Sequence, residues 1–268
     1  MAGQMIVLPG VTAAAGSGAP RVSMNAPDTI AAKMLGLKNV VSARSLALLP
    51  GGGVSGRCRA TGLPLIPRGA ASNTLGLYDI AGRTGLGLSS GGAGALGLPA
   101  DSIPSSFTLV MAVALSATDI ASGVIVNLLS GFDGSDVYTN MLARYYGSMH
   151  ATLANKIRCA ISTGGTVADT AMAAGAWAIV VIDFDNTSKK MSIAVNQVST
   201  FSAVTMATAN APGAGSYIEI GYHADSNGLR NSKVGDLYTF SDSLLKTDLG
   251  KSQLAELVAA LKTYYSIA

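Results

Sequence analysis

Apolar and polar positions alternate most regularly between Trp177 and Asn196, where the sequence reads WAIVVIDFDNTSKKMSIAVN. In the first half of this stretch, both sets of alternate residues are mostly apolar, which predicts a strand covered on both faces. Residues 185–188 (DNTS) supply a polar turn, and apolar residues then alternate with small or polar ones from Met191 to Val195. The stretch therefore predicts a hairpin inside a layered β protein.

Further strands are predicted on both sides of this hairpin. Between residues 40 and 99, glycines cut the apolar sequence into short pieces that suit edge strands and loops, since each Gly costs roughly 1 kcal/mol in a helix relative to Ala. Asp133-Gly134 is typical of a hairpin turn. Longer strands are predicted within residues 106–116, 123–134, 137–153, 156–163, 216–224 and 234–241.

Helical spacing of apolar residues is clear only near the C-terminal end, where Gly250–Tyr265 predicts a long helix. Near the other end, Asp28–Leu35 predicts a short helix capped by Asp28 or Thr29. Many strands and one terminal helix together indicate a β-sandwich or jelly roll.

The composition supports a large folded core, because 49% of the 268 residues are hydrophobic and only 12% are charged. The 32 glycines favour tight turns and close contacts in assemblies. No apolar run reaches the roughly 18 residues that span a bilayer, so membrane insertion is not expected. Cys58 and Cys159 fit no metal spacing and are expected to be buried thiols.

Positive charge is concentrated toward the N-terminal end. Residues 1–83 carry eight basic and two acidic residues, a net charge of +6, whereas the rest of the chain is at −3. With the Ala, Gly and Pro of residues 1–40, this predicts an arm that docks on an acidic partner or, equally, a solvated irregular segment. Nucleic-acid binding is not predicted, because the charges are dispersed and almost no aromatic residues lie among them.

Three stretches follow one another along the chain: SFTLVMAVALS, the Trp177–Asn196 hairpin, and the run from YIEIGY through GDLYTF into the terminal helix. In their order, they resemble the concanavalin A-like/laminin-G-like jelly-roll family. The resemblance implies an all-β, concanavalin A-like jelly-roll sandwich over residues 41–268, with an extended N-terminal arm over residues 1–40 and a C-terminal helix. It carries no information on activity. The matching positions are Ser106, Phe107, Thr108, Trp177, Asp183, Asp185, Asn196, Ile220, Gly221, Gly235, Asp236, Leu237, Tyr238, Phe240, Leu244 and Leu245.

Glycoside hydrolysis is not predicted. Glycosidases generally need two carboxyl groups roughly 5 to 9 Å apart. The chain has only two glutamates, Glu219 and Glu256, and the second lies on the predicted terminal helix. The Glu-x-Asp-x-Glu pattern of hydrolases with this fold is absent. The sequence therefore predicts a protein that is not an enzyme.

Calcium is the candidate cofactor, because lectin-like relatives bind it through Asp, Asn and carbonyl oxygens. The candidate ligands are Asp183, Asp185 and Asn186, with a second cluster at Asp225 and Asn227. Neither cluster is as acidic as a dedicated site, and the alternative is that both only shape turns.

A glycan is the candidate ligand, because sugars need an aromatic face together with planar hydrogen-bonding groups. Aromatic packing beneath polar loops is the alternative. No nucleophile motif or metal spacing surrounds either histidine, so each is expected to be a strand residue with a satisfied hydrogen bond. The candidate surface comprises Tyr145, Tyr146, Tyr222, His223, Asp225, Asn227 and Arg230.

Jelly rolls that end in such a helix resemble modules of bacteriophage tail and capsid accessory proteins. The resemblance implies a structural protein of the virion without enzymatic activity, in a tail, fibre or baseplate that contacts the host surface or its glycans. Its implied partners are other virion proteins through the arm and further copies of the chain in a homo-oligomer. The alternatives are a capsid decoration protein, a free glycan-binding lectin and a glycan-active enzyme.

Overall fold

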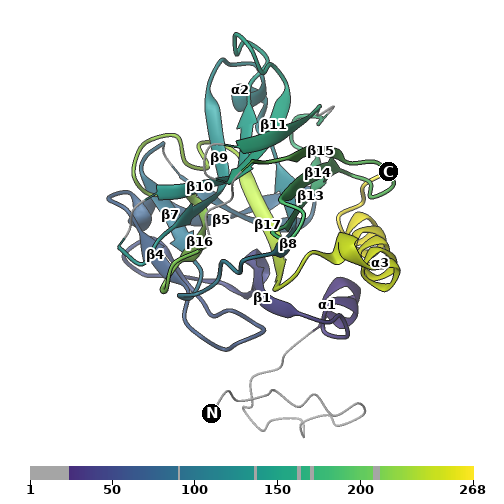
Figure 1. The fold of residues 1–268 in the computed structure, drawn as a ribbon. Coiled ribbons are helices and arrows are strands. Elements are labelled where there is room, and N and C mark those ends of the chain that lie inside the picture. The colour runs from purple at the N-terminus through teal and green to yellow at the C-terminus, as the bar shows by residue number, and fades with distance from the viewer. Residues whose placement is uncertain (1–23, 90, 136–137, 162–163, 170–171, 208–211) are drawn as a thin grey trace, which may run out of the picture.

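Two antiparallel sheets packed face to face form the body of the protein in a computed structural model, which describes residues 24–268 except 90, 136–137, 162–163, 170–171 and 208–211 (Figure 1). Spatial order in the first sheet is β15 (Ser202–Thr205), β14 (Lys190–Val195), β13 (Trp177–Asp185), β8 (Phe107–Ala114), β17 (Lys233–Phe240), β6 (Arg83–Leu88) and β5 (Leu75–Ile80), and β1 (Leu37–Ser42) also pairs with β17. The second sheet runs β12 (Gly164–Asp169), β11 (Lys156–Ile161), β10 (Tyr138–Tyr146), β9 (Ile125–Phe132), β16 (Tyr217–Tyr222), β7 (Gly94–Gly97) and β4 (Ile66–Arg68). A small separate ribbon joins β2 (Ala47–Leu48) to β3 (Val54–Ser55).

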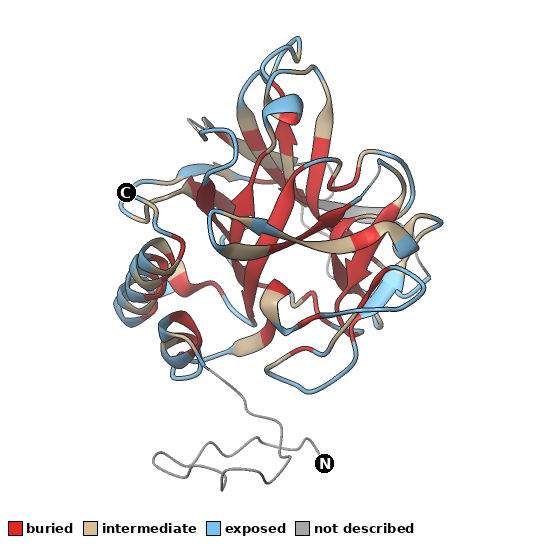
Figure 2. Cartoon of the chain, turned by 180° about the vertical axis from the view of Figure 1, so that it is seen from behind, coloured by how far each residue is buried: buried red, intermediate tan, exposed pale blue. Residues whose placement is uncertain are grey.

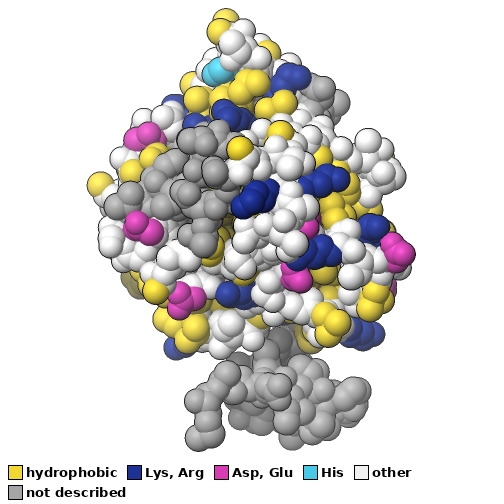
Figure 3. All heavy atoms as spheres, in the orientation of Figure 1, with side chains coloured by type: hydrophobic (Ala, Val, Ile, Leu, Met, Phe, Trp, Pro, Cys, Tyr) yellow, Lys and Arg dark blue, Asp and Glu magenta, His cyan; other side chains and the backbone are white. Residues whose placement is uncertain are grey.

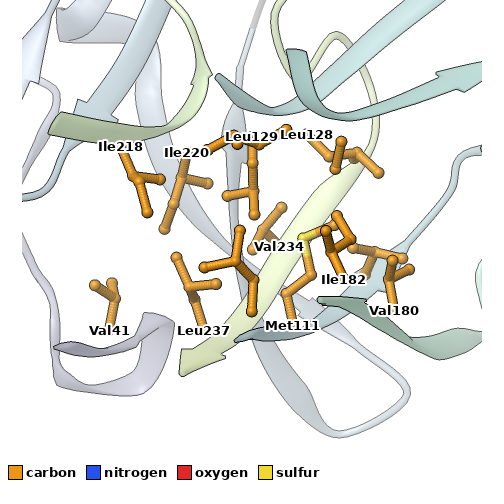
Figure 4. Close-up of a cluster of buried hydrophobic side chains, with 14 of the residues drawn as sticks. Val41, Met111, Leu128, Leu129, Val180, Ile182, Ile218, Ile220, Val234 and Leu237 are labelled. Carbon is orange, nitrogen blue, oxygen red and sulfur yellow. The ribbon is translucent and has the colours of Figure 1, made fainter. Parts of the chain in front are cut away.

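The main core lies between the sheets, where alternate residues of each strand meet. Figure 4 shows Met111, Ile182 and Leu237 of the first sheet facing Leu129 and Ile220 of the second. Most strand residues are buried (Figure 2). The arrangement confirms the predicted all-β jelly-roll sandwich.

A second apolar cluster covers the outer face of the first sheet under two helices, α1 (Ala26–Ala31) and α3 (Asp248–Tyr264), which lie side by side in Figures 1 and 2. Ile179 and Val181 of β13 belong to this cluster, whereas Val180 and Ile182 belong to the main core. The prediction that both faces of this strand are covered is therefore confirmed.

The C-terminal helix is confirmed and begins at Asp248, two residues before its predicted start. The Thr247 hydroxyl accepts a hydrogen bond from the Gly250 N–H at 3.0 Å and so satisfies one of the free N–H groups of the first turn. A short helix, α2 (Ala117–Ile120), follows β8. No helix in the described residues is long and apolar enough to cross a membrane.

The N-terminal helix begins two residues earlier than predicted, ends four residues earlier, and is capped by Asn25 rather than Asp28 or Thr29. The Asn25 side chain accepts a hydrogen bond from the Asp28 N–H at 2.8 Å, and the Asp28 carboxylate accepts one from the Asn25 N–H at 3.1 Å. The two bonds complete a capping box. Pro27 in the first turn favours this start because it has no N–H to satisfy.

The predicted boundary between an arm and a body at residue 40 falls inside β1, which pairs with β17. Residues 24–40 therefore belong to the sandwich, because α1 contacts α3 and β1 extends the first sheet. Residues 1–23 lie outside the described residues, so an arm there stays a prediction.

The predicted hairpin and long strands are found within the expected ranges, except that β17 begins one residue earlier, at Lys233. Asp185 pairs with Lys190 across the turn of the hairpin. Cys58 and Cys159 are buried free thiols, as predicted. Basic side chains are scattered over the face shown in Figure 3 rather than gathered into one patch.

Candidate functional site

Aromatic, acidic and basic side chains come together on the outer side of the second sheet, where β16 pairs with β9. Because Ile218 and Ile220 point into the core, the alternate residues Tyr217 and Glu219 lie on the outer side. Gly221 then has a φ of +96°, and a Cβ there would lie 3.1 Å from the Gly94 carbonyl oxygen. This glycine breaks the alternation just before the strand ends and the loop begins at residue 223.

Four rings gather on this side and are called the aromatic layer: Phe132, Tyr217, Tyr222 and His223. The Phe132 ring stacks against Tyr217 at 5.6 Å and against Tyr222 at 5.9 Å, and its centroid lies 4.5 Å from that of His223. Phe132 and Tyr217 are buried, whereas Tyr222 and His223 are partly exposed. The layer therefore presents two rings to solvent on a rigid apolar base.

Glu219 holds His223 in place. The Glu219 carboxylate accepts from the His223 N–H at 3.0 Å, and its other oxygen lies 2.8 Å from His223 Nδ1. Burial raises the pKa of Glu219, and the bonds and charge of His223 act in the opposite direction. Nε2 of His223 has no hydrogen-bond partner among the described residues, so it is the ring nitrogen open to a ligand.

One arginine packs against the layer and a second lies on the neighbouring strand β10. The Arg68 guanidinium lies 3.9 Å from the centre of the Tyr217 ring. Gly97 makes room for it, because a Cβ there would lie 2.9 Å from Arg68 Nε. Arg144, on β10, donates from Nε to Asn127 Oδ1 of β9 at 2.6 Å. Burial raises the pKa of Tyr222, the Asp225 charge adds to this, and the Arg144 charge opposes it, so both groups lie within electrostatic reach of the phenol.

The loop after β16 is held by its own side chains. Asp225 accepts from the Asn227 N–H at 2.6 Å, and Asn227 Oδ1 accepts from Arg230 Nη2 at 2.6 Å. Arg230 Nε donates to the Ile125 carbonyl at 3.0 Å, which ties the loop to β9. The structure thus brings five of the predicted residues to one rim: Tyr222, His223, Asp225, Asn227 and Arg230.

Tyr145 and Tyr146 do not belong to this surface. Tyr145 is in the main core, where its hydroxyl donates to Asn155 Oδ1 at 3.1 Å. Tyr146 is also buried, with its ring edge to face against His150 at 4.7 Å. Adjacent strand residues point to opposite faces, so the two rings could not share one surface.

The candidate calcium ligands bind neighbouring protein groups. Asp183 is 2% exposed, and its two oxygens accept from Thr108 at 2.6 Å and from Ser243 at 2.7 Å. Asp185 accepts from the turn and lies 3.1 Å from Lys246 Nζ, while the Asn186 N–H donates to Ser106. No group of three or more His, Cys, Asp or Glu side chains in the described part of the chain could hold a metal ion, which includes the cluster at Asp225.

Asp183 makes stability depend on pH. Burial raises its pKa from 3.8 to about 6, although hydrogen bonds from Thr108, Ser243 and the Leu245 backbone oppose the shift. The folded state therefore binds an extra proton between these values, and the free energy of unfolding should fall as pH rises through this window, by about 3 kcal/mol at most. Asp183→Asn should flatten this part of the curve in urea unfolding from pH 4 to pH 7.

Asp185→Asn is the matched control for this prediction. Partial burial opposes ionisation of Asp185, but hydrogen bonds from Ser188, Lys246 and the Thr187 N–H, with the Lys246 charge, hold its pKa at about 2. Its own contribution is therefore present at both ends of the pH range tested. Asp185→Asn should change the slope far less than Asp183→Asn does, by no more than the small share that the Asp185 charge has in raising the pKa of Asp183. An equal slope in wild type and Asp183→Asn would contradict the assignment to Asp183.

Comparisons with known proteins give a fold. No protein-family model matches the sequence, and no curated protein matches it. Among solved structures, a Trypanosoma rangeli sialidase superposes on 85% of this chain with a TM-score of 0.57 and a sequence identity of 14%. The Trypanosoma rangeli sialidase in complex with sialic acid also covers 85% of this chain, with a TM-score of 0.57 and a sequence identity of 13%. Domain 4 of an extracellular arabinanase from Geobacillus stearothermophilus, in complex with arabinotriose, gives a TM-score of 0.49 at 14% identity and covers 73% of this chain and 88% of that one.

The chain spans only a third of the sialidases, since it covers 33% of each. At this identity, the sialidase matches establish the β-sandwich fold alone.

Proposed function

We propose that this chain is a carbohydrate-binding β-sandwich module that acts without catalysis. The observation that carries the proposal is the aromatic layer, which offers Tyr222 and His223 to solvent next to the loop that carries Asp225 and Asn227. Sugars bind through just such a pairing of a ring face with planar or charged hydrogen-bonding groups. One of the similar structures is a complex with sialic acid, which agrees with this ligand class.

The buried carboxylate of the site argues for binding rather than hydrolysis. Glu219 is 0% exposed, and both of its oxygens contact His223. A general acid must reach the glycosidic oxygen of its substrate. Glu219 instead fixes the ring that would touch a ligand.

The experiment is a glycan array that includes neutral, sulfated and sialylated glycans, probed with the purified chain. Each glycan that binds is then incubated with the chain, and the products are separated by chromatography. We expect binding with no release of sugar. Cleavage would replace the proposal with a glycan-active enzyme, and the absence of binding to any glycan would overturn it.

We propose further that the module belongs to a bacteriophage virion, in a tail, fibre or baseplate that contacts host glycans as a homo-oligomer. The support is the resemblance of the sequence to such modules and its abundance of small residues. Quantitative mass spectrometry of purified particles tests this placement through the copy number of the chain. A few to some tens of copies are expected, hundreds would indicate capsid decoration, and none would leave a free lectin.

A further inference from the structure

A lysine lies almost buried on the outer side of the first sheet, beyond the part that α1 and α3 cover. Lys233, at the start of β17, is 8% exposed. Its side chain runs over β6, where a Cβ at Gly87 would lie 2.1 Å from Lys233 Cδ and 2.7 Å from Nζ. A Cβ at Gly85 would lie 2.9 Å from Lys233 Cβ. The two glycines therefore form a trough that the lysine fills.

The ammonium group in this trough has no carboxylate partner. Nζ donates to the Asn231 carbonyl at 3.0 Å and lies 4.3 Å from the centre of the Tyr78 ring. Among the described residues, no Asp or Glu is in ion-pair contact with it. Asp119 is close enough to act on Lys233 through space, but its oxygens already accept from Asn231 and Ser232.

Burial lowers the pKa of Lys233, and the charge of Asp119 acts in the opposite direction. A desolvated cation that retains unused N–H donors is costly and gains from an anion.

A cavity of about 310 Å³ adjoins this lysine. Small, mostly apolar residues line it, and Lys233 is the only charged residue among them: Ile80, Ala114, Leu115, Ser116, Ala117, Ala174, Gly175, Asn231 and Lys233. Ala117, Ala174 and Gly175 are exposed, so the cavity opens to solvent at this rim. Its volume is at the lower end of the range for sites of small molecules.

We propose that this cavity binds a small carboxylate-bearing molecule, with the carboxylate against the Lys233 ammonium and an apolar body along Ala114 and Leu115. The single positive charge matches one carboxylate, whereas a phosphate dianion would retain an unpaired charge among apolar walls. The site lies on the first sheet and does not depend on the glycan site of the second.

Calorimetric titration with straight-chain carboxylates from acetate to octanoate, at low salt and pH 7, tests the proposal. Affinity should rise about fourfold for each added methylene until the cavity is full. Lys233→Met should lower the affinity for hexanoate at least about tenfold, since methionine fills a similar space without the charge. Gly87→Ala should weaken binding as well, because its Cβ takes the place of the ammonium group.

Lys190→Met is the control, because Lys190 is an exposed lysine of β14 and its loss changes the net charge equally. It should bind hexanoate as wild type does. Should Lys233→Met fail to fold, acetylation of wild type by acetic anhydride gives a second measurement, in which hexanoate should protect Lys233 and leave Lys190 reactive. Equal binding of hexanoate and neutral hexanamide, unchanged binding by Lys233→Met, or no protection of Lys233 would overturn the proposal.

Discussion

Replacing Asp28 by alanine should lower the free energy of unfolding by about 3 kcal/mol, since it leaves two partly buried guanidinium groups and a buried tyrosine hydroxyl without their shared partner. The Asp28 carboxylate accepts hydrogen bonds from Arg44, from Arg59 at 2.7 Å and from the Tyr238 hydroxyl at 2.9 Å. Its side chain is only 5% exposed. The loss should appear in urea unfolding at pH 7 as a lower midpoint with an unchanged slope.

Asp248→Ala is the control for this prediction, because the Asp248 side chain is fully exposed and, among the described residues, pairs only with Lys251 at 3.0 Å. Such a surface pair contributes little, so little or no change is expected. Asp28→Asn should fall between wild type and Asp28→Ala, because it keeps an acceptor for Tyr238 without the charge. A loss for Asp28→Ala no larger than that for Asp248→Ala would show that α1 is not held to the sandwich by this carboxylate.

Strands and helices could be predicted wherever their own sequence shows a regular spacing of apolar residues. The hairpin of β13 and β14 follows from alternation and a polar turn, and α3 follows from helical spacing. Two strands at the edges of the sheets were missed, β12 with the sequence GGTVAD and β15 with SAVT. Their glycines and exposed positions leave no apolar period to detect, and only pairing with a neighbouring strand reveals them.

The candidate site was predictable only where its residues share one segment. Tyr222 ends β16, and His223 through Arg230 follow in the next loop, so these residues come together. Arg68, Asn127, Phe132 and Arg144 join them through strand pairing, because Phe132 lies opposite Tyr217 and Arg68 reaches the layer across β7. The pair of Glu219 and His223 depends on the break in alternation at Gly221, and irregular register in β10 hides which tyrosine faces the core.

Tyr222→Ala should reduce affinity for any glycan that the array identifies by at least about tenfold. The substitution removes the ring that lies on Phe132 at 5.9 Å and leaves Phe132, Tyr217 and the pair of Glu219 and His223 in place. Because the ring is partly exposed, the variant should remain folded at the assay temperature. Calorimetry with the glycan that binds most tightly on the array measures the affinity, and thermal unfolding shows whether the variant is folded.

Tyr222→Phe and Tyr264→Ala separate the ring face from general effects of losing a tyrosine. Phenylalanine keeps the stacked ring, so Tyr222→Phe should retain most of the affinity unless the sugar also bonds to the hydroxyl. Tyr264, on α3, is also partly exposed, and the Arg83 guanidinium lies 4.2 Å from its ring, but it lies on the outer side of the other sheet. Tyr264→Ala should therefore bind as wild type does. Equal losses in Tyr222→Ala and Tyr264→Ala, or no loss in Tyr222→Ala, would place the glycan outside the aromatic layer.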